Sequence, residues 1–181
     1  PQRGSFGRLW RAPLAWLLLG AAVVRGAALL AGSGALGEDR DDYRTLAQAV
    51  INNGSLAIGG NPTAYRPPLY PLVLAAWGAA FGLTVGAIGT LHWLIGIAPV
   101  GLVVLVGRQW GLGRVSYLAG LLVAVDPILI HQSTQVMTET LATFLATAAL
   151  WALGAAGLRG TARSALLAGL MLALATLCRP T

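Results

Sequence analysis

The sequence predicts an all-α protein, a polytopic transmembrane helical bundle with an extracytoplasmic loop that carries short amphipathic helices beside the membrane. Of its 181 residues, 56% are hydrophobic and 10% are charged, whereas a soluble domain carries about 25% charged residues. Apolar runs of about 18 residues or more recur along the chain. Four of the six acidic residues lie together between such runs, within residues 37–71.

The charge pattern indicates a membrane protein rather than a nucleic-acid-binding one. All twelve basic residues are arginines, and the net charge is +6. The arginines are scattered in short segments between apolar runs, as the positive-inside rule expects of cytoplasmic loops. The single Cys178 lies in an apolar run, which indicates a buried apolar residue and allows no disulfide. Because the chain starts without Met and stops straight after an apolar run, we expect a fragment of a longer protein.

The first span is predicted at residues 12–31, about 30 Å long at about 1.5 Å per residue. It follows a flank that contains three arginines, Arg3, Arg8 and Arg11. Arg25 interrupts the span, and an arginine near a helix centre costs about 2.5–3.5 kcal/mol on insertion scales. The pattern favours snorkelling of Arg25 toward the interface. The alternative is that Arg25 faces the helix bundle or a lipid phosphate.

A short amphipathic helix is predicted just after the acidic cluster. Apolar side chains recur at helical spacing from Tyr43 to Ile51, which predicts one buried stripe. Asp41 and Asp42 are expected in the first turn, where the helix dipole favours negative charge, and Gly54 is expected to end the helix. Such a helix would lie on the membrane surface.

The topology depends on residues 72–81, which are apolar but too short to cross a bilayer. They follow residues 55–71, which are rich in Gly and Pro and therefore predicted to be irregular. With residues 32–86 as one outer loop, the later spans are predicted at residues 87–107, 115–131, 137–157 and 165–178. The turns between them then place four arginines in the cytoplasm: Arg108, Arg114, Arg159 and Arg163. A crossing at residues 72–81 would put these four outside, so the positive-inside rule favours the single loop.

This topology gathers six polar side chains at the outer face: Asp39, Arg66, Asp126, His131, Glu139 and Arg179. Polar groups at membrane depth are costly and usually functional. Glu139 also suits a purely structural role at a helix N-terminus. Asp126 before Pro127 indicates a helix bend, and His131 indicates an interfacial polar residue rather than a ligand. His92, beside Trp93, is expected in an aromatic belt.

Four segments follow one another in an order and spacing that resemble bacterial membrane glycosyltransferases of the GT-C type. They read DRDDYRTLAQAVINNG, TAYRPPLYPLVLAAWGAAFG, DPILIHQSTQVMTETLATFL and LAGLMLALATLCRPT. The nearest group is glycosyltransferase family 39, which contains the dolichyl-phosphate-mannose protein mannosyltransferases and the lipid A aminoarabinose transferase. The resemblance implies a multi-pass enzyme of the plasma or inner membrane. It would move a sugar from a polyprenyl-phosphate donor to a hydroxyl of a protein, lipid or glycan acceptor at the outer face.

The resemblance also implies roles for individual residues. In the family, an acid at the start of the first outer loop acts as the base. Asp39, four residues before Tyr43, matches this place, with Asp42 as the alternative, whereas Asp41 is expected to point to solvent. Arg66, followed by Pro67 and Pro68, matches a motif whose basic residue meets the donor phosphate.

The predicted substrate-binding residues are Tyr43, Arg66, Glu139 and Arg179, with Glu139 matching the family's acid after the third span. The chain departs from the family pattern at two places, because Arg40 rather than a second acid follows Asp39, and Tyr65 rather than an acid precedes Arg66. The sequence does not decide whether a divalent metal ion takes part.

Two other functions compete with the transferase. A transporter would need charged or broken segments near the bilayer midplane and internal repeats, and no convincing repeat is present. A non-catalytic membrane scaffold would not need Asp39, Arg66 and Glu139 on one side of the membrane.

Overall fold

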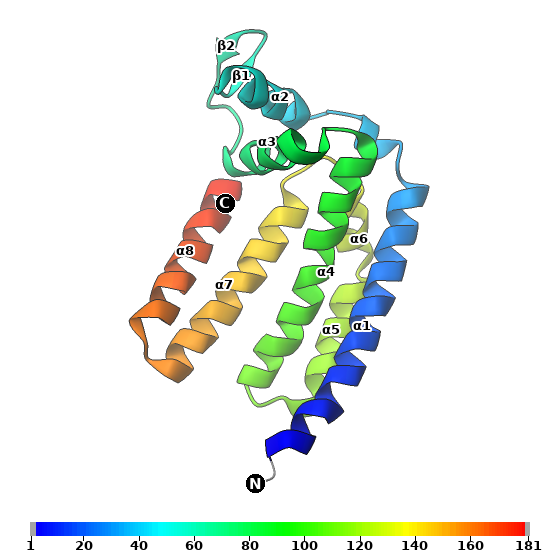
Figure 1. The fold of residues 1–181 in the computed structure, drawn as a ribbon, viewed down its shortest axis with the longest axis vertical. Coiled ribbons are helices and arrows are strands. Elements are labelled where there is room, and N and C mark those ends of the chain that lie inside the picture. The colour runs from blue at the N-terminus through cyan, green and yellow to red at the C-terminus, as the bar shows by residue number, and fades with distance from the viewer. Residues whose placement is uncertain (1–2, 180–181) are drawn as a thin grey trace.

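The computed structural model describes residues 3–179, with side chains for residues 12–158 and 160–179. Figure 1 shows a bundle of long helices with a separate region covering one end. Within the described residues, helices dominate and the strands are two residues long, so the all-α prediction is confirmed. Four arginines used for the predicted topology have side chains outside the described residues: Arg3, Arg8, Arg11 and Arg159.

Six helices form the bundle: α1 (Arg3–Ala31), α4 (Val85–Gln109), α5 (Ser116–Val125), α6 (Pro127–Ser133), α7 (Glu139–Arg159) and α8 (Ala162–Cys178). Helix α4 packs against α1, α5 and α7, and α8 packs against α7. A 3₁₀ turn, η2 (Gly113–Val115), joins α4 to α5. The first helix begins earlier than the predicted span, and α7 begins two residues later than predicted.

The helices have the length and surface of membrane spans. Within residues 3–179, three helices (α1, α4 and α7) are long and apolar enough to cross a bilayer, and the bent α5–α6 pair could form a fourth span. Large apolar side chains face outward, including Leu30 (82% exposed) and Leu166 (73% exposed). Exposed apolar surface of this kind fits a lipid environment. The protein is therefore a multi-pass membrane protein.

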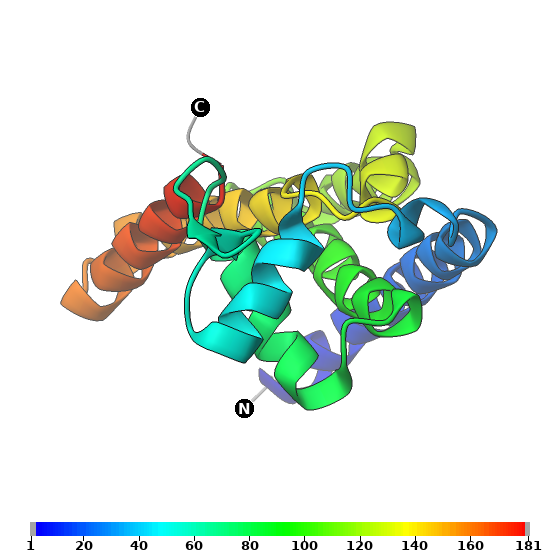
Figure 2. The same cartoon turned by 90° about the horizontal axis from the view of Figure 1, so that it is seen from above.

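The region at one end of the bundle consists of η1 (Ala35–Gly37), α2 (Tyr43–Asn53), β1 (Ala57–Ile58), β2 (Asn61–Pro62) and α3 (Leu69–Phe81). Figures 1 and 2 show α2 and α3 side by side across the ends of the bundle helices. Helix α3 has 13 residues, which makes it about 20 Å long at about 1.5 Å per residue. The sequence missed the antiparallel β1–β2 hairpin, which lies inside the stretch predicted to be irregular. We call this end of the molecule the loop end.

Helix α2 buries the predicted stripe but begins differently. Tyr43, Leu46 and Ala47 are buried, and Gly54 ends the helix at φ 67°, a left-handed conformation that glycine adopts at little cost. The helix begins at Tyr43, and Asp42 precedes it at φ 61° without a side-chain capping bond. The expectation that Asp41 and Asp42 occupy the first turn is therefore wrong.

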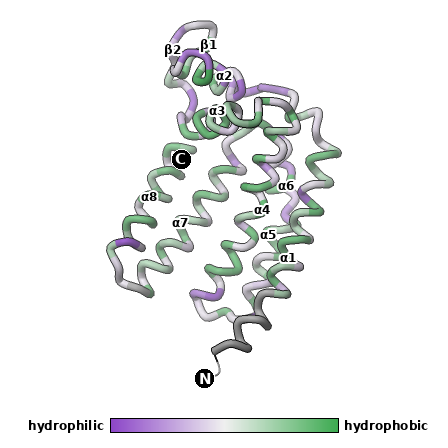
Figure 3. Tube along the Cα trace, in the orientation of Figure 1, coloured by the Kyte–Doolittle hydropathy of each residue, from purple (hydrophilic) through white to green (hydrophobic). Residues whose placement is uncertain are grey.

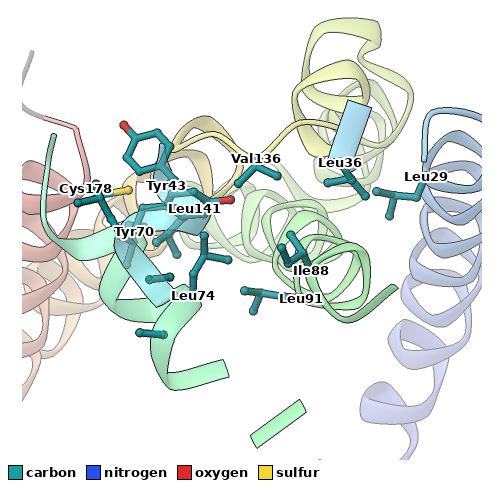
Figure 4. Packing of buried hydrophobic residues seen from close by; sticks show 14 residues of the cluster. Leu29, Leu36, Tyr43, Tyr70, Leu74, Ile88, Leu91, Val136, Leu141 and Cys178 are labelled. Carbon is teal, nitrogen blue, oxygen red and sulfur yellow. The ribbon is translucent and has the colours of Figure 1, made fainter. Parts of the chain in front are cut away.

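One hydrophobic core joins the loop end to the bundle. It combines buried side chains from α1, η1, α2, α3, α4, α7 and α8. Figure 4 shows Tyr43, Tyr70, Leu141 and Cys178 on one side of this core, with Leu29 and Leu36 on the other. Each buried aliphatic or aromatic side chain contributes about 1.5–3 kcal/mol. The core therefore fixes the position of α2 and α3, and it confirms that Cys178 is buried.

A break between α5 and α6 explains the buried arginine of α1. The two helices meet at 50°, and the Asp126 carboxylate caps α6, which confirms the predicted bend. Pro127 has no N–H, so the Val123 carbonyl loses its helical donor. Arg25, 2% exposed, donates to the carbonyls of Val123 (3.4 Å) and Leu129 (3.2 Å). The snorkelling prediction for Arg25 is wrong, and the bundle-facing alternative is confirmed.

His92 is a core residue rather than part of an aromatic belt, so that prediction is also wrong. It is fully buried, with Nε2 2.8 Å from the Tyr70 hydroxyl and Nδ1 2.9 Å from the Ser133 carbonyl. A carbonyl only accepts, so Nδ1 carries the proton and the Tyr70 hydroxyl donates to Nε2. His92 therefore ties α3 to α4 and to the end of α6.

Polarity differs between the two ends of the bundle. Figure 3 shows apolar helices with hydrophilic residues in the α4–α5 and α7–α8 turns and around α2. The turns opposite the loop end carry Arg114 and Arg163, whereas Asp39, Asp41 and Glu139 lie at the loop end. The acids therefore gather at the loop end, which also carries Arg40, Arg44, Arg66 and Arg179. Which side of the membrane the loop end faces stays a prediction.

Candidate active site

Asp39 holds the N-terminus of α2 with both carboxylate oxygens. Its Oδ1 accepts from the Arg44 backbone N–H at 2.9 Å, and its Oδ2 accepts from the Thr45 backbone N–H and hydroxyl, each at 2.8 Å. A carboxylate offers about four lone-pair sites, so one site on Oδ1 is left. The helix dipole also favours a negative charge at this place. Asp39 is thus a fixed carboxylate with one acceptor site unused by these contacts.

The acids next to Asp39 differ in their contacts and in their exposure to solvent. Asp42, the alternative base, is exposed and makes no capping bond with its side chain. Asp41 does not point to solvent as predicted, because its Oδ1 lies 2.6 Å from Nη2 of Arg66 and its side chain is only 25% exposed. Glu38 pairs with Arg40 in an exposed contact. Neither Arg40 nor Arg66 forms an ion pair with Asp39.

Arg66 lies between a carboxylate and two aromatic rings. Its guanidinium carbon is 4.8 Å from the Tyr65 ring centre and 5.7 Å from the Tyr43 ring centre, within the range of cation–π attraction. Pro67 and Pro68 follow it and restrict the backbone between Arg66 and α3. Its Nε is buried and has no hydrogen-bond partner. One donor of the Arg66 guanidinium is therefore unsatisfied in this structure.

Tyr43 and Tyr70 form the centre around which the charged residues lie. Their rings meet edge to face at 5.0 Å. Burial raises the pKa of Tyr43, Arg66 lowers it, and the carboxylates of Asp41 and Glu139 raise it. Burial also raises the pKa of Tyr70 well above its ordinary value, with Asp39 and Glu139 among the smaller causes. Both hydroxyls are therefore protonated at neutral pH and can act as hydrogen-bond donors.

Glu139 and Arg179 form an ion pair at the loop end of α7 and α8. Arg179 Nη1 lies 2.7 Å from Glu139 Oε1. Glu139 Oε2 is buried and has no hydrogen-bond partner. The pair lies at one end of a groove of about 420 Å³ lined by small and polar residues of both helices, including Ala142, Thr143 and Thr176. Glu139 is the first residue of α7, which agrees with the predicted position near a helix N-terminus.

The structure thus brings Tyr43, Arg66, Glu139 and Arg179 to the loop end, with Asp39 on the adjoining N-terminus of α2. Sequence reasoning missed Thr45, which anchors Asp39, and Tyr70, which packs against Tyr43. Tyr70 lies four residues after Arg66, just beyond Pro67 and Pro68. This position in the sequence could have indicated that Tyr70 belongs to the site. No three His, Cys, Asp or Glu side chains are grouped to hold a metal ion among the described residues.

Comparison with known proteins identifies a family but no individual relative. A search of curated proteins finds no match, and a search of solved structures finds none. The family model for dolichyl-phosphate-mannose-protein mannosyltransferase matches residues 65–181, which is more than half of the chain. The match contains Arg66, Glu139 and Arg179, whereas Asp39 and Tyr43 precede it. The chain belongs to the dolichyl-phosphate-mannose-protein mannosyltransferase family.

Proposed function

We propose that this protein transfers a sugar from a polyprenyl-phosphate donor to an acceptor hydroxyl at the extracytoplasmic face of the cell membrane. The family implies a membrane glycosyltransferase that uses donors of this kind. One observation carries the assignment to these residues. The Arg66 guanidinium lies 5.7 Å from the Tyr43 ring centre at the loop end. Glu139, from a distant part of the sequence, raises the pKa of Tyr43, and Asp39 caps the helix that begins at Tyr43.

Asp39 is proposed as the general base. An acceptor hydroxyl that attacks the anomeric carbon must lose its proton, and a positioned carboxylate contributes about 10²–10⁴-fold to such a step. The bonds from Arg44 and Thr45 fix the carboxylate and leave one acceptor site on Oδ1. Asp42 is the alternative base, but no side-chain capping bond anchors it to α2.

Arg66 is proposed to bind the donor phosphate. The bond between the anomeric carbon and the phosphate oxygen breaks, and its electron pair leaves with the polyprenyl phosphate. The leaving group is already an anion, so the step needs a cation more than a protein acid. Arginine meets phosphate through two parallel N–H bonds, and the Arg66 side chain, 25% exposed, is open to such a contact. Asp41 holds the rest of the fork in place through Nη2.

Glu139 and Arg179 are proposed to bind the donor sugar. The buried Oε2 of Glu139 has no partner, and a buried carboxylate oxygen is costly until it accepts a hydrogen bond. A sugar hydroxyl satisfies it without adding charge. Arg179, whose side chain is 48% exposed, keeps Glu139 paired and offers further donors to the same sugar.

The proposed function is tested with full-length protein in membranes and two radiolabelled donors. One donor is a sugar linked to polyprenyl phosphate, and the other is the same sugar linked to a nucleotide. We expect label in the acceptor fraction from the lipid-linked donor alone. Transfer from the nucleotide-linked donor in the absence of polyprenyl phosphate would contradict the proposed donor class.

A further inference from the structure

The polar face of α2 carries amides and hydroxyls instead of charges. No charged residue occurs from Thr45 to Tyr65. On α2, Thr45, Gln48 and Asn52 recur at helical spacing on the face opposite the buried stripe. A helix face that only meets water usually carries charged residues. This stretch is therefore unusual for a solvated surface, and it suits recognition of an uncharged polar ligand.

A groove of about 440 Å³ follows this face. Its lining includes Thr45, Gln48 and Asn52 from α2, with Gly59 and Gly60 from the turn of the β1–β2 hairpin. The hairpin packs against α2 through β1, and the two lie side by side in Figures 1 and 2. The glycines have φ of 58° and 83°, so they leave backbone groups uncovered by side chains. The groove thus offers donors and acceptors from both side chains and main chain.

One end of the groove meets the residues that anchor Asp39. Arg44 and Thr45 line it, and their backbone N–H groups hold the Asp39 carboxylate. The charge of Arg44 is directed away from a ligand, because its guanidinium donates to the carbonyls of Leu36 and Gly37. A ligand lying in the groove would therefore place its end near the proposed base.

We propose that this groove binds the acceptor and that the acceptor is a neutral carbohydrate. The proposal rests on the proposed function in that Asp39 deprotonates the acceptor. Each sugar hydroxyl is one donor and two acceptors, which amides complement in both directions. Gln48 Nε2 donates to Asn52 Oδ1 at 2.9 Å, which leaves Gln48 Oε1 as an acceptor and Asn52 Nδ2 as a donor outside this bond. A peptide bound by strand addition would need a longer strand edge than β1 and β2 offer, because each has only two residues.

The test measures binding without turnover, so that it is separate from the donor assay. Full-length protein in nanodiscs is mixed with neutral gluco-, manno- and galacto-oligosaccharides, or with uncharged Ser- and Thr-rich peptides, and saturation-transfer NMR is recorded. In Ala49→Trp, an indole fills the groove from α2, where Ala49 lines it. Ser55→Trp is the matched control, because Ser55 is exposed and is not among the lining residues.

We expect saturation transfer to at least one oligosaccharide, weakened about 10-fold or more by Ala49→Trp and unchanged by Ser55→Trp. Absence of binding to all three oligosaccharide classes would overturn the proposal, and so would binding that Ala49→Trp leaves intact. Binding of the peptides instead would assign the groove to a protein acceptor and refute the carbohydrate. If the groove binds as expected while the lipid-linked sugar is never transferred, the proposed function fails and the groove assignment stands.

Discussion

Two arginines, Arg66 at the loop end and Arg25 inside the bundle, show how differently the protein uses a charge near the membrane. Each has a buried Nε without a hydrogen-bond partner. Arg25 donates to main-chain carbonyls of the α5–α6 break. Arg66 pairs with the Asp41 carboxylate and lies against the rings of Tyr43 and Tyr65.

The partners decide what each arginine can do. The carbonyl of Val123 loses its helical donor to Pro127, so Arg25 supplies a bond that the fold itself lacks. A transporter would require a broken helix with a buried charge. Here the buried charge has a structural role, because Arg25 donates hydrogen bonds to the carbonyls at the α5–α6 break. The partners of Arg66 are side chains, which can rearrange when a phosphate binds. The comparison predicts that stability depends on Arg25 and donor use on Arg66.

The largest expected effect comes from Asp39 at the loop end. Asp39→Asn keeps the shape of the side chain but removes its basicity, and turnover should fall about 100-fold or more. Donor binding should be largely kept. The measurement is the rate of sugar transfer from a lipid-linked donor by full-length variants matched for membrane expression.

Two controls separate catalysis from helix capping. Asp39→Asn also places an amide N–H against the α2 backbone donors, which costs about 1 kcal/mol as a lost cap. Thr45→Ala removes one bond to Asp39 and keeps the carboxylate, so it should retain most of the activity. An inactive Asp42→Asn beside an active Asp39→Asn would identify Asp42 as the base. Full activity in both Asp variants would show that the base is elsewhere.

Arg66 should affect donor affinity more than stability. Arg66→Ala removes the proposed phosphate contact, and a charge-assisted bond is worth about 1.5–3 kcal/mol, which corresponds to a roughly 10- to 100-fold rise in the donor KM. Arg66→Lys keeps the charge and loses the fork, so an intermediate loss is expected. Donor kinetics at saturating acceptor give the answer, and an unchanged donor KM in Arg66→Ala would rule out the phosphate role.

Arg25 should show the opposite pattern. Arg25→Met keeps a long apolar side chain and leaves the carbonyls of Val123 and Leu129 without their donor, at a cost of about 1–3 kcal/mol. Thermal unfolding in detergent should occur at lower temperature, with the donor KM unchanged. A raised donor KM at unchanged stability would mean that the bundle interior takes part in donor binding.

The smallest effect is expected from the hydrogen bond between Tyr70 and His92. Tyr70→Phe preserves the packing and removes a bond worth about 0.5–1.5 kcal/mol. Because the folded-state pKa of Tyr70 is raised above its ordinary value of 10.0, the stability linked to its proton is complete below pH about 10 and is lost as the pH rises further. The stability difference between wild type and Tyr70→Phe should therefore shrink in alkaline buffer. A constant difference would contradict the raised pKa.

The sequence predicted the elements whose causes are local. Apolar length predicted the long helices, helical spacing predicted the buried stripe from Tyr43, and Asp126 with Pro127 predicted the bend. The family resemblance predicted Tyr43 and Arg66 as substrate-binding residues, and the Arg66 guanidinium lies 5.7 Å from the Tyr43 ring centre. These features depend on the spacing of residues along a few helical turns or on a short motif. Both can be read directly from the sequence.

Contacts between distant segments were not predictable. Nothing in the sequence around Arg25 shows that Pro127 frees a carbonyl beside it, and His92 gives no sign of its bond to Tyr70. Asp41 and Asp39 are close in sequence, yet one pairs with Arg66 and the other caps α2. Asp42, which follows both, has a left-handed backbone, and residue type alone does not predict that conformation.

The central claim is that residues 32–86 form one loop on the extracytoplasmic side of the membrane. Every proposed residue role depends on this topology. In a Cys178→Ser background, which removes the single cysteine, cysteines are placed at Ile58 and Thr84 in the loop and at Val115 in the opposite turn. A membrane-impermeant thiol reagent is then applied to intact cells. The account predicts labelling at Ile58 and Thr84, with Val115 labelled only after the membrane is opened. Labelling of Ile58 and Thr84 from opposite sides, or of Val115 alone in intact cells, would contradict it.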